Sequence, residues 1–171
     1  MDSIEAVKTA FGGAHMWYQG TVAGLTSEEA NALPPGVAHP IAELMAHILH
    51  SEDVMLNVLV RGEQPIWERD GWDKKLGLPM MLRQDNESAR SFRCDPQQLD
   101  PYTHAVFTNT DTYLSSLTPA DLDTELDLTA AGMGKMTLAS LLLTMVLGNT
   151  YAHTGEISAL KGLHGQKGYP F

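Results

Sequence analysis

The sequence predicts an all-α protein, a four-helix bundle with a long crossover between its second and third helices. Apolar residues recur at three- and four-residue steps in four separate segments, which is the spacing of a buried helical face. The segment 62–96, in contrast, contains Gly and Pro breaks and has no sustained period, which indicates the crossover. No alternating strand pattern competes, because the Asp70-Gly71 pair lies beside Trp and Lys residues rather than β-branched runs. We expect residues 1–171 to form one domain.

The first two helices are indicated by their capping residues and their apolar faces. Ser3 is the expected N-cap of a helix that extends to about Gly24. Pro40 suits the first turn of a second helix, which ends at Gly62. The two faces consist of Ile4, Val7, Phe11, His15, Tyr18 and Val22, and of Ile41, Leu44, Met45, Ile48, Met55, Leu56 and Leu59.

The third and fourth helices have similar signals. Asp100-Pro101 reads as a cap followed by a first-turn proline, and the apolar period then continues to Leu117. Thr137 precedes the apolar run LASLLLTMVL and opens a helix that extends to about Lys161, where Gly162 ends it.

Two further patterns concern the arrangement of these helices. The acidic turns 25–33 and 117–126 both begin with Leu-Thr and both follow a helix, which indicates a duplicated helical hairpin. Near the end of the sequence, Tyr169 and Phe171 either anchor the tail over the bundle or a partner subunit, or belong to a frayed tail.

Composition excludes several classes of partner. The chain has 11 Lys and Arg against 21 Asp and Glu, a net charge of −10, which disfavours nucleic acid or an anionic membrane as the main partner. Cys94 is the only cysteine, so neither an internal disulfide nor a thiolate metal cluster is possible. No signal peptide is expected at the N-terminus, and the apolar segment 138–152 is too short for a membrane span. We therefore expect a cytoplasmic protein.

Polar residues interrupt two of the apolar faces. On the fourth helix, Asn149, His153 and Glu156 lie within roughly 60° of one another and are predicted to face the core. On the second helix, Glu52 lies within the apolar stripe and His47 flanks it. Burial of such groups is costly unless hydrogen bonds, counter-charges or a metal compensate.

Two interpretations of this pattern remain open. A pair at positions i and i+4 of one helix, together with a histidine of a neighbouring helix, is typical of an open three-ligand metal site. Alternatively, the same side chains form a hydrogen-bonded network in the core. The amide oxygen of Asn149 is a poorer ligand for zinc or nickel than imidazole or carboxylate. His50 points nearer to the opposite side of its helix.

The segments HPIAELMAHILHSED and NTYAHTGEISALKG resemble the DinB-like superfamily of metalloenzymes. The resemblance covers essentially the whole chain and implies a four-helix bundle that assembles as a homodimer. It also implies a metal triad at His47, Asn149 and His153, where Asn149 occupies a position that is His or Glu in the family. Family members of assigned function include bacillithiol S-transferases and a mycothiol-dependent maleylpyruvate isomerase.

Two functions follow as expectations. In the first, a divalent metal such as Zn²⁺ or Ni²⁺, held by the triad, binds a low-molecular-weight thiol as thiolate, and the protein is a thiol S-transferase or a related thiol-dependent enzyme. Glu52 or Glu156 would then substitute as a ligand, orient a ligand or carry a proton. In the second, the bundle is a non-enzymatic, small-ligand-binding or stress-associated protein with a metal-free polar network.

Overall fold

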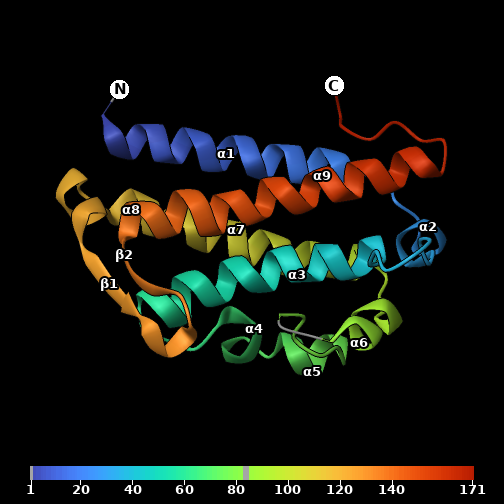
Figure 1. The fold of residues 1–171 in the computed structure, drawn as a ribbon, viewed down its shortest axis with the longest axis horizontal. Helices are drawn as coiled ribbons and strands as arrows, with labels where there is room; N and C mark the ends of the chain where they lie inside the picture. Colours follow the sequence, from blue (N-terminus) through green and yellow to red (C-terminus); the bar gives the residue numbers. More distant parts are fainter. Residues whose placement is uncertain (1, 83–84) are drawn as a thin grey trace.

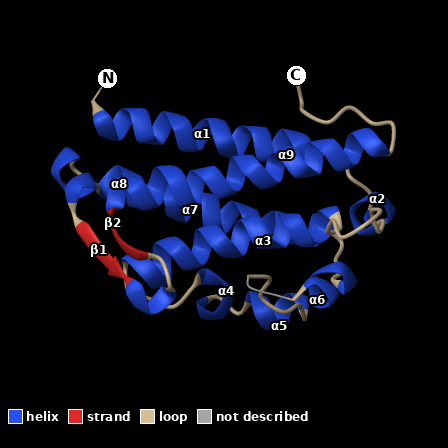
Figure 2. Ribbon diagram, in the orientation of Figure 1, coloured by secondary structure: helices blue, strands red, loops and turns tan. Residues whose placement is uncertain are grey.

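The computed structural model describes residues 2–82 and 85–171. Within these ranges the chain is mainly helical, and four long helical segments lie side by side (Figures 1 and 2). The predicted all-α class is therefore confirmed in the main. None of the helices in these ranges has the length and apolarity needed to cross a membrane.

The long segments correspond to the four predicted helices. They are α1 (Ser3–Val22); α3 (Ile41–Asp53) with its π-helical continuation η1 (Val54–Val60); α7 (Asp100–Ser116); and α8 (Leu138–Ser140), η5 (Leu141–Val146) and α9 (Leu147–Leu163) in succession. Helices α1 and α3 each pack against both α7 and α9. Helices α1 and α3 therefore share the same two neighbours, and the buried apolar residues lie along these helices.

Capping explains where two of these segments begin. Thr137 is the N-cap of α8, as predicted, because its hydroxyl accepts a hydrogen bond from the Ser140 N–H at 3.1 Å. The prediction for Ser3 is wrong by one residue: Asp2 is the N-cap of α1, and its carboxylate accepts from the Glu5 N–H at 2.9 Å.

The repeated Leu-Thr turns have the same local structure. Each forms a short helix, α2 (Ser27–Asn31) and η3 (Pro119–Asp123), that begins with a capping box. Thr26 and Thr118 supply the hydroxyls, and Glu29 and Asp121 supply the carboxylates that bond back to the cap. The repeat that the sequence indicates is therefore present in the two turns.

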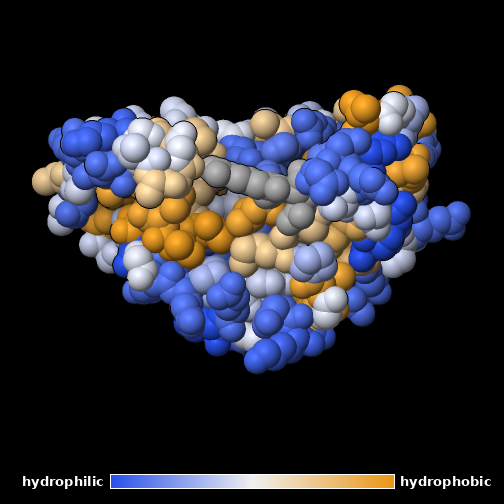
Figure 3. Space-filling model, turned by 60° about the horizontal axis from the view of Figure 1, so that its bottom comes forward, coloured by the Kyte–Doolittle hydropathy of each residue, from blue (hydrophilic) through white to orange (hydrophobic). Residues whose placement is uncertain are grey.

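The crossover is more helical than expected. Its described part contains α4 (Ile66–Arg69), α5 (Trp72–Leu76) and α6 (Asn86–Ser91), although the sequence shows no sustained helical period there, and η2 (Pro96–Leu99) follows. These helices lie along α3 on the side of the molecule away from α1 (Figure 1). Figure 3 shows this side, where apolar surface lies across the middle and hydrophilic side chains form the lower edge.

A short antiparallel hairpin was not predicted. It consists of β1 (Glu125–Leu128) and β2 (Gly134–Thr137), and Leu128 pairs with Gly134 next to the turn. The strands are too short to show a period, and the turn contains a 3-10 segment, η4 (Thr129–Ala131), and Gly132 at φ +76° instead of an Asn-Gly pair.

The C-terminal tail folds back over α1 and α9 (Figure 1). The Trp17 ring contacts the Tyr169 and Phe171 rings at centroid distances of 5.6 and 4.9 Å. A Cβ atom on Gly20 would lie 2.7 Å from the Pro170 ring, so this close approach requires glycine. Deeper in the same interface, the buried Lys161 ammonium donates to the Thr21 carbonyl at 2.6 Å. Of the alternatives for the tail, docking on its own chain is the one observed.

Candidate ligand-binding site

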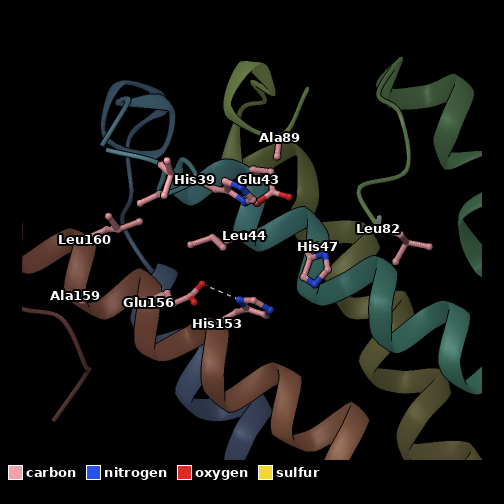
Figure 4. Close-up of a pocket in the computed structure, with 12 residues that line it drawn as sticks. His39, Glu43, Leu44, His47, Leu82, Ala89, His153, Glu156, Ala159 and Leu160 are labelled. Atoms are coloured by element: carbon pink, nitrogen blue, oxygen red, sulfur yellow. Dashed lines mark hydrogen bonds and ion pairs between the residues drawn. The ribbon is translucent and has the colours of Figure 1, made fainter. Parts of the chain in front are cut away.

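A cleft of about 460 Å³ lies between α3 and α9, with α6 at its rim (Figure 4). Its described lining combines an apolar part with five ionisable side chains. The apolar residues are Val37, Ala38, Leu44, Leu82, Ala89, Ala159 and Leu160, and the ionisable residues are His39, Glu43, His47, His153 and Glu156.

Helical spacing places the polar side chains on the two walls of the cleft. Glu43 and His47 are four positions apart on one face of α3, and His39 lies in the loop just before the helix, where it bonds to Glu43. On the opposite wall, His153 and Glu156 are three positions apart on α9. The two walls therefore present imidazole and carboxylate groups toward the same space.

His47 is held in one orientation by the crossover. Its Nδ1 lies 3.2 Å from the Met81 carbonyl oxygen, so the Nδ1–H donates there and Nε2 retains its lone pair. Burial, and then the neighbouring His153, lowers the pKa of His47, and bonding to Met81 and Asn149 opposes this effect. The neutral ring presents Nε2 as an acceptor, and the nearest donor to it is the Ser51 hydroxyl at 3.4 Å.

His153 has a matching arrangement on α9. Its ring lies 4.8 Å from the His47 ring, centroid to centroid, at an interplanar angle of 83°. Its Nδ1 lies 2.8 Å from Glu156 Oε2, so in the neutral ring Nε2 is again the free acceptor. Figure 4 shows the two imidazoles facing each other across the cleft. Two imidazoles, one from each wall, therefore lie next to each other at the cleft.

Glu43 and His39 form a second imidazole and carboxylate pair in the cleft. Glu43 Oε2 lies 3.0 Å from His39 Nδ1, and the His39 Nε2 lies 3.3 Å from Asn86 Oδ1 on α6. Burial raises the pKa of Glu43, and the charge and hydrogen bond of His39 partly offset this effect. The pair fixes α6 against α3 at the rim of the cleft.

The structure places the three predicted ligand residues in one region. His47 and His153 lie together, and Asn149, one turn before His153, is close enough to His47 to influence its pKa. The Asn149 Nδ2 is buried and has no hydrogen-bond partner among the described residues. The prediction that this arc faces the core is wrong, because the side chains of His153 and Glu156 are 25% and 56% exposed. The arc faces the cleft instead.

Glu52, which the sequence offered as a substitute ligand, lies outside the cleft. Its carboxylate bonds to His15 Nε2 at 3.0 and 3.2 Å and accepts from the Thr110 hydroxyl at 2.5 Å. The His15 ring stacks on Phe107 at 3.6 Å. Glu52 is buried as expected, but it faces α1 and α7 and not the cleft, so it is not available as a ligand or proton carrier beside His47.

Three components of the site were not identified from the sequence. Neither His39 nor Glu43 was among the predicted site residues. The role of the Met81 carbonyl depends on tertiary structure. The four-residue spacing between Glu43 and His47 is the helical signal that indicates Glu43. His39 precedes the helix, so helical spacing does not indicate it. No local signal identifies Met81.

The residues present do not fit a three-ligand catalytic metal centre. In residues 2–82 and 85–171, no group of three or more His, Cys, Asp or Glu side chains is arranged to hold a metal ion. The carboxylates of Glu43 and Glu156 face their own histidines. The third position belongs to the Asn149 amide, a weak donor for zinc or nickel. Two imidazoles alone fall short of the usual three protein ligands.

Comparisons with known proteins place this chain in a family. No match was found among curated proteins. The fold is similar to the crystal structure of a conserved protein from Enterococcus faecalis, with a TM-score of 0.83 and 20% sequence identity, over 97% of this chain and 99% of that one. Residues 11–157 match the family model of the DinB superfamily. Because this match covers most of the sequence, the chain belongs to the DinB superfamily.

Proposed function

We propose that this protein is a four-helix bundle that binds a small organic molecule, without a metal, in the cleft between α3 and α9. A single observation carries the proposal. The His47 and His153 rings lie 4.8 Å apart at the cleft with both Nδ1 atoms committed to hydrogen bonds, which leaves Nε2 of each neutral ring as the acceptor, and the Ser51 hydroxyl lies 3.4 Å from that of His47. Hydrogen-bond donors on a ligand would satisfy these nitrogens.

The shape of the cleft supports the same proposal. Small-molecule sites are mostly apolar cavities of roughly 300–1,000 Å³ with a few polar groups that fix orientation. The cleft, at about 460 Å³, has this composition, with Leu44, Leu82 and Leu160 among its apolar residues. An apolar body would pack there, and the polar group would reach the two histidines.

The first experiment measures metal content, because it separates this proposal from metal chemistry. Untagged protein, purified without chelators and then desalted after exposure to Zn²⁺ or Ni²⁺, is expected to retain far less than one ion per chain. Near-stoichiometric metal that disappears in His153→Ala, with the fold intact by circular dichroism, would overturn the metal-free site.

The second experiment measures ligand binding. Histidine side-chain NMR resonances of the metal-free protein are followed during titration with small apolar alcohols and amines. We expect saturable shifts of the His47 and His153 ring signals, with the exposed His164 as internal control. If none of the compounds shifts the two rings, the binding function is wrong.

One observation favours a second candidate, a metal-dependent thiol S-transferase. The Met81 carbonyl and the Glu156 carboxylate orient the two imidazoles in the way that outer hydrogen bonds orient metal-ligating histidines. If the protein retains stoichiometric metal, thiol-transfer assays with low-molecular-weight thiols follow. The homodimer that the family resemblance implies also remains a prediction, and light scattering measures it.

A further inference from the structure

The polar atoms that face the cleft are mainly hydrogen-bond acceptors. They comprise the Nε2 atoms of neutral His47 and His153 and the carboxylates of Glu43 and Glu156. No Lys or Arg occurs among the described lining residues. The neighbouring Arg90 guanidinium donates to the Ala38 and Pro34 carbonyls. Among the described lining residues, hydrogen-bond acceptors therefore predominate.

The two carboxylates also make the described lining of the cleft acidic. Glu43 belongs to the α3 wall and Glu156 to the α9 wall, so each wall of the cleft carries one acidic group (Figure 4). In the part of the chain that the structure describes, each is hydrogen-bonded to a histidine, and neither is paired with a Lys or Arg side chain. An anionic ligand would be repelled by both, whereas a cationic ligand would be attracted to both.

We infer that the ligand of this cleft is an apolar primary amine, whose ammonium group donates hydrogen bonds to His47 and His153. The inference rests on the proposed function. An ammonium group has three N–H donors and no acceptor, which matches two imidazole nitrogens and a carboxylate. An alcohol or a thiol has one donor, which leaves one of the two nitrogens without a partner. The apolar residues, among them Leu44, Leu82 and Leu160, pack against the hydrocarbon part.

The test compares head groups on one hydrocarbon chain. Binding of n-hexylamine, n-hexanol and n-hexanoate to the full chain is measured by NMR titration, with EDTA present to remove metal. We expect n-hexylamine to bind at least tenfold more tightly than n-hexanol and n-hexanoate not to bind. The amine is expected to shift the ring resonances of His47 and His153.

A matched pair of variants separates a specific site from general attraction to an acidic protein. Glu156→Gln removes one negative charge from the cleft, and Glu125→Gln removes one from the exposed hairpin strand β1. We expect amine affinity to fall about fivefold or more in Glu156→Gln and to stay unchanged in Glu125→Gln. n-Hexanol affinity should be the same in both variants.

The outcomes distinguish failure of the amine inference from failure of the proposed binding function. If n-hexanol or n-hexanoate shifts the two rings as strongly as the amine, the inference about the head group is wrong while the binding function stands. Equal losses of amine affinity in both variants would also overturn the inference, because attraction would then be general. If no member of the series binds, the proposed function fails.

Discussion

Helix α3 carries two polar regions that differ in one respect. Asp53, which is 1% exposed, accepts four hydrogen bonds, from the main-chain N–H groups of Ile66 and Trp67, the Tyr102 hydroxyl and the Asn57 amide, at 2.7–2.9 Å. His47, about two turns earlier, has an acceptor nitrogen that faces the cleft with Ser51 as its nearest donor. Because a satisfied buried group has nothing left to bind, Asp53 serves the fold, and His47 is available to a ligand.

His50 connects the two regions through the crossover. Its Nδ1 accepts from the Met81 N–H at 2.7 Å, while the Met81 carbonyl accepts from His47. Its ring packs against the Trp67 ring, and the main-chain N–H of Trp67 donates to Asp53. The orientation of the cleft histidine therefore depends on how the crossover is fixed to α3.

Replacement of Asp53 should have the largest effect on stability. Asp53→Ala leaves two main-chain N–H groups and the Tyr102 hydroxyl without their acceptor in the interior. We expect a loss of about 3–5 kcal/mol in the free energy of unfolding, measured by urea denaturation. Asp127→Ala on the exposed hairpin is the control and should change stability by less than about 0.5 kcal/mol. A loss below 1 kcal/mol for Asp53→Ala would remove the contrast between the two regions.

The pair Glu52→Gln and Glu156→Gln compares a closed carboxylate with an open one. Glu52 is buried against His15 and Thr110, so we expect Glu52→Gln to destabilise the protein by about 2–3 kcal/mol. Glu156→Gln changes an exposed residue and should lower the free energy of unfolding by less than about 0.5 kcal/mol. Ligand affinity is expected to change in the opposite order. Similar unfolding curves for both variants would contradict the assignment.

His50 makes stability depend on pH. Burial, and then the neighbouring His47, lowers the pKa of His50 from 6.5 to about 3, so between these values the unfolded chain binds more protons than the folded chain. Stability should therefore fall as pH decreases below 6.5, with a slope from this residue of up to about 1.4 kcal/mol per pH unit. Burial also lowers the pKa of His47, which adds to the same trend, while the raised pKa of Glu43 opposes it.

The measurement compares urea unfolding of wild type and His50→Leu between pH 7 and pH 5. His47 and Glu43 are present in both proteins, so the difference in slope belongs to His50. We expect a shallower dependence in His50→Leu. His50→Asn, which retains an acceptor for the Met81 N–H, should also be shallower but should preserve ligand affinity better than His50→Leu. Parallel slopes in all three proteins would show that His50 is not protected from protonation.

His153→Ala should have the smallest effect on stability and a large one on binding. The side chain is 25% exposed and its hydrogen bond is to the exposed Glu156, so we expect a change of less than about 0.5 kcal/mol. Calorimetry with n-hexylamine should show at least a tenfold loss of affinity, with His164→Ala unchanged. Unaltered affinity in His153→Ala would place the ligand elsewhere.

Much of the helical framework was predictable because its signals are local. The apolar periods and the Thr137 cap lie within single segments, and they agree with the structure. The prediction for Pro40 is wrong by one residue, because Pro40 is the N-cap of α3 and not part of its first turn. The hairpin was missed because β1 and β2 are too short to establish a period. The helices of the crossover were missed because part of what holds them is Asp53, a residue of another element.

The site was predictable only in part for the same reason. His47 and His153 occupy helical positions that a pattern can identify, and they do lie together. The partner of Glu52 is His15 on α1, and no spacing within α3 predicts a contact between residues 37 positions apart. The functional state of an imidazole depends on what its second nitrogen bonds to, and for His47 that partner is a main-chain atom of the crossover.

The packing of α1 against α9 has a kinetic consequence. The Lys161 bond to the Thr21 carbonyl joins residues 140 positions apart, and the Tyr151 bond to the Ala10 carbonyl joins residues 141 apart. Such contacts close a loop that includes most of the chain. The chain must therefore lose conformational entropy to close the loop before these contacts can stabilise it. We therefore expect folding slower than that of helical proteins with mainly local contacts, and α1 should dock late, onto α3, α7 and α9 that have already assembled.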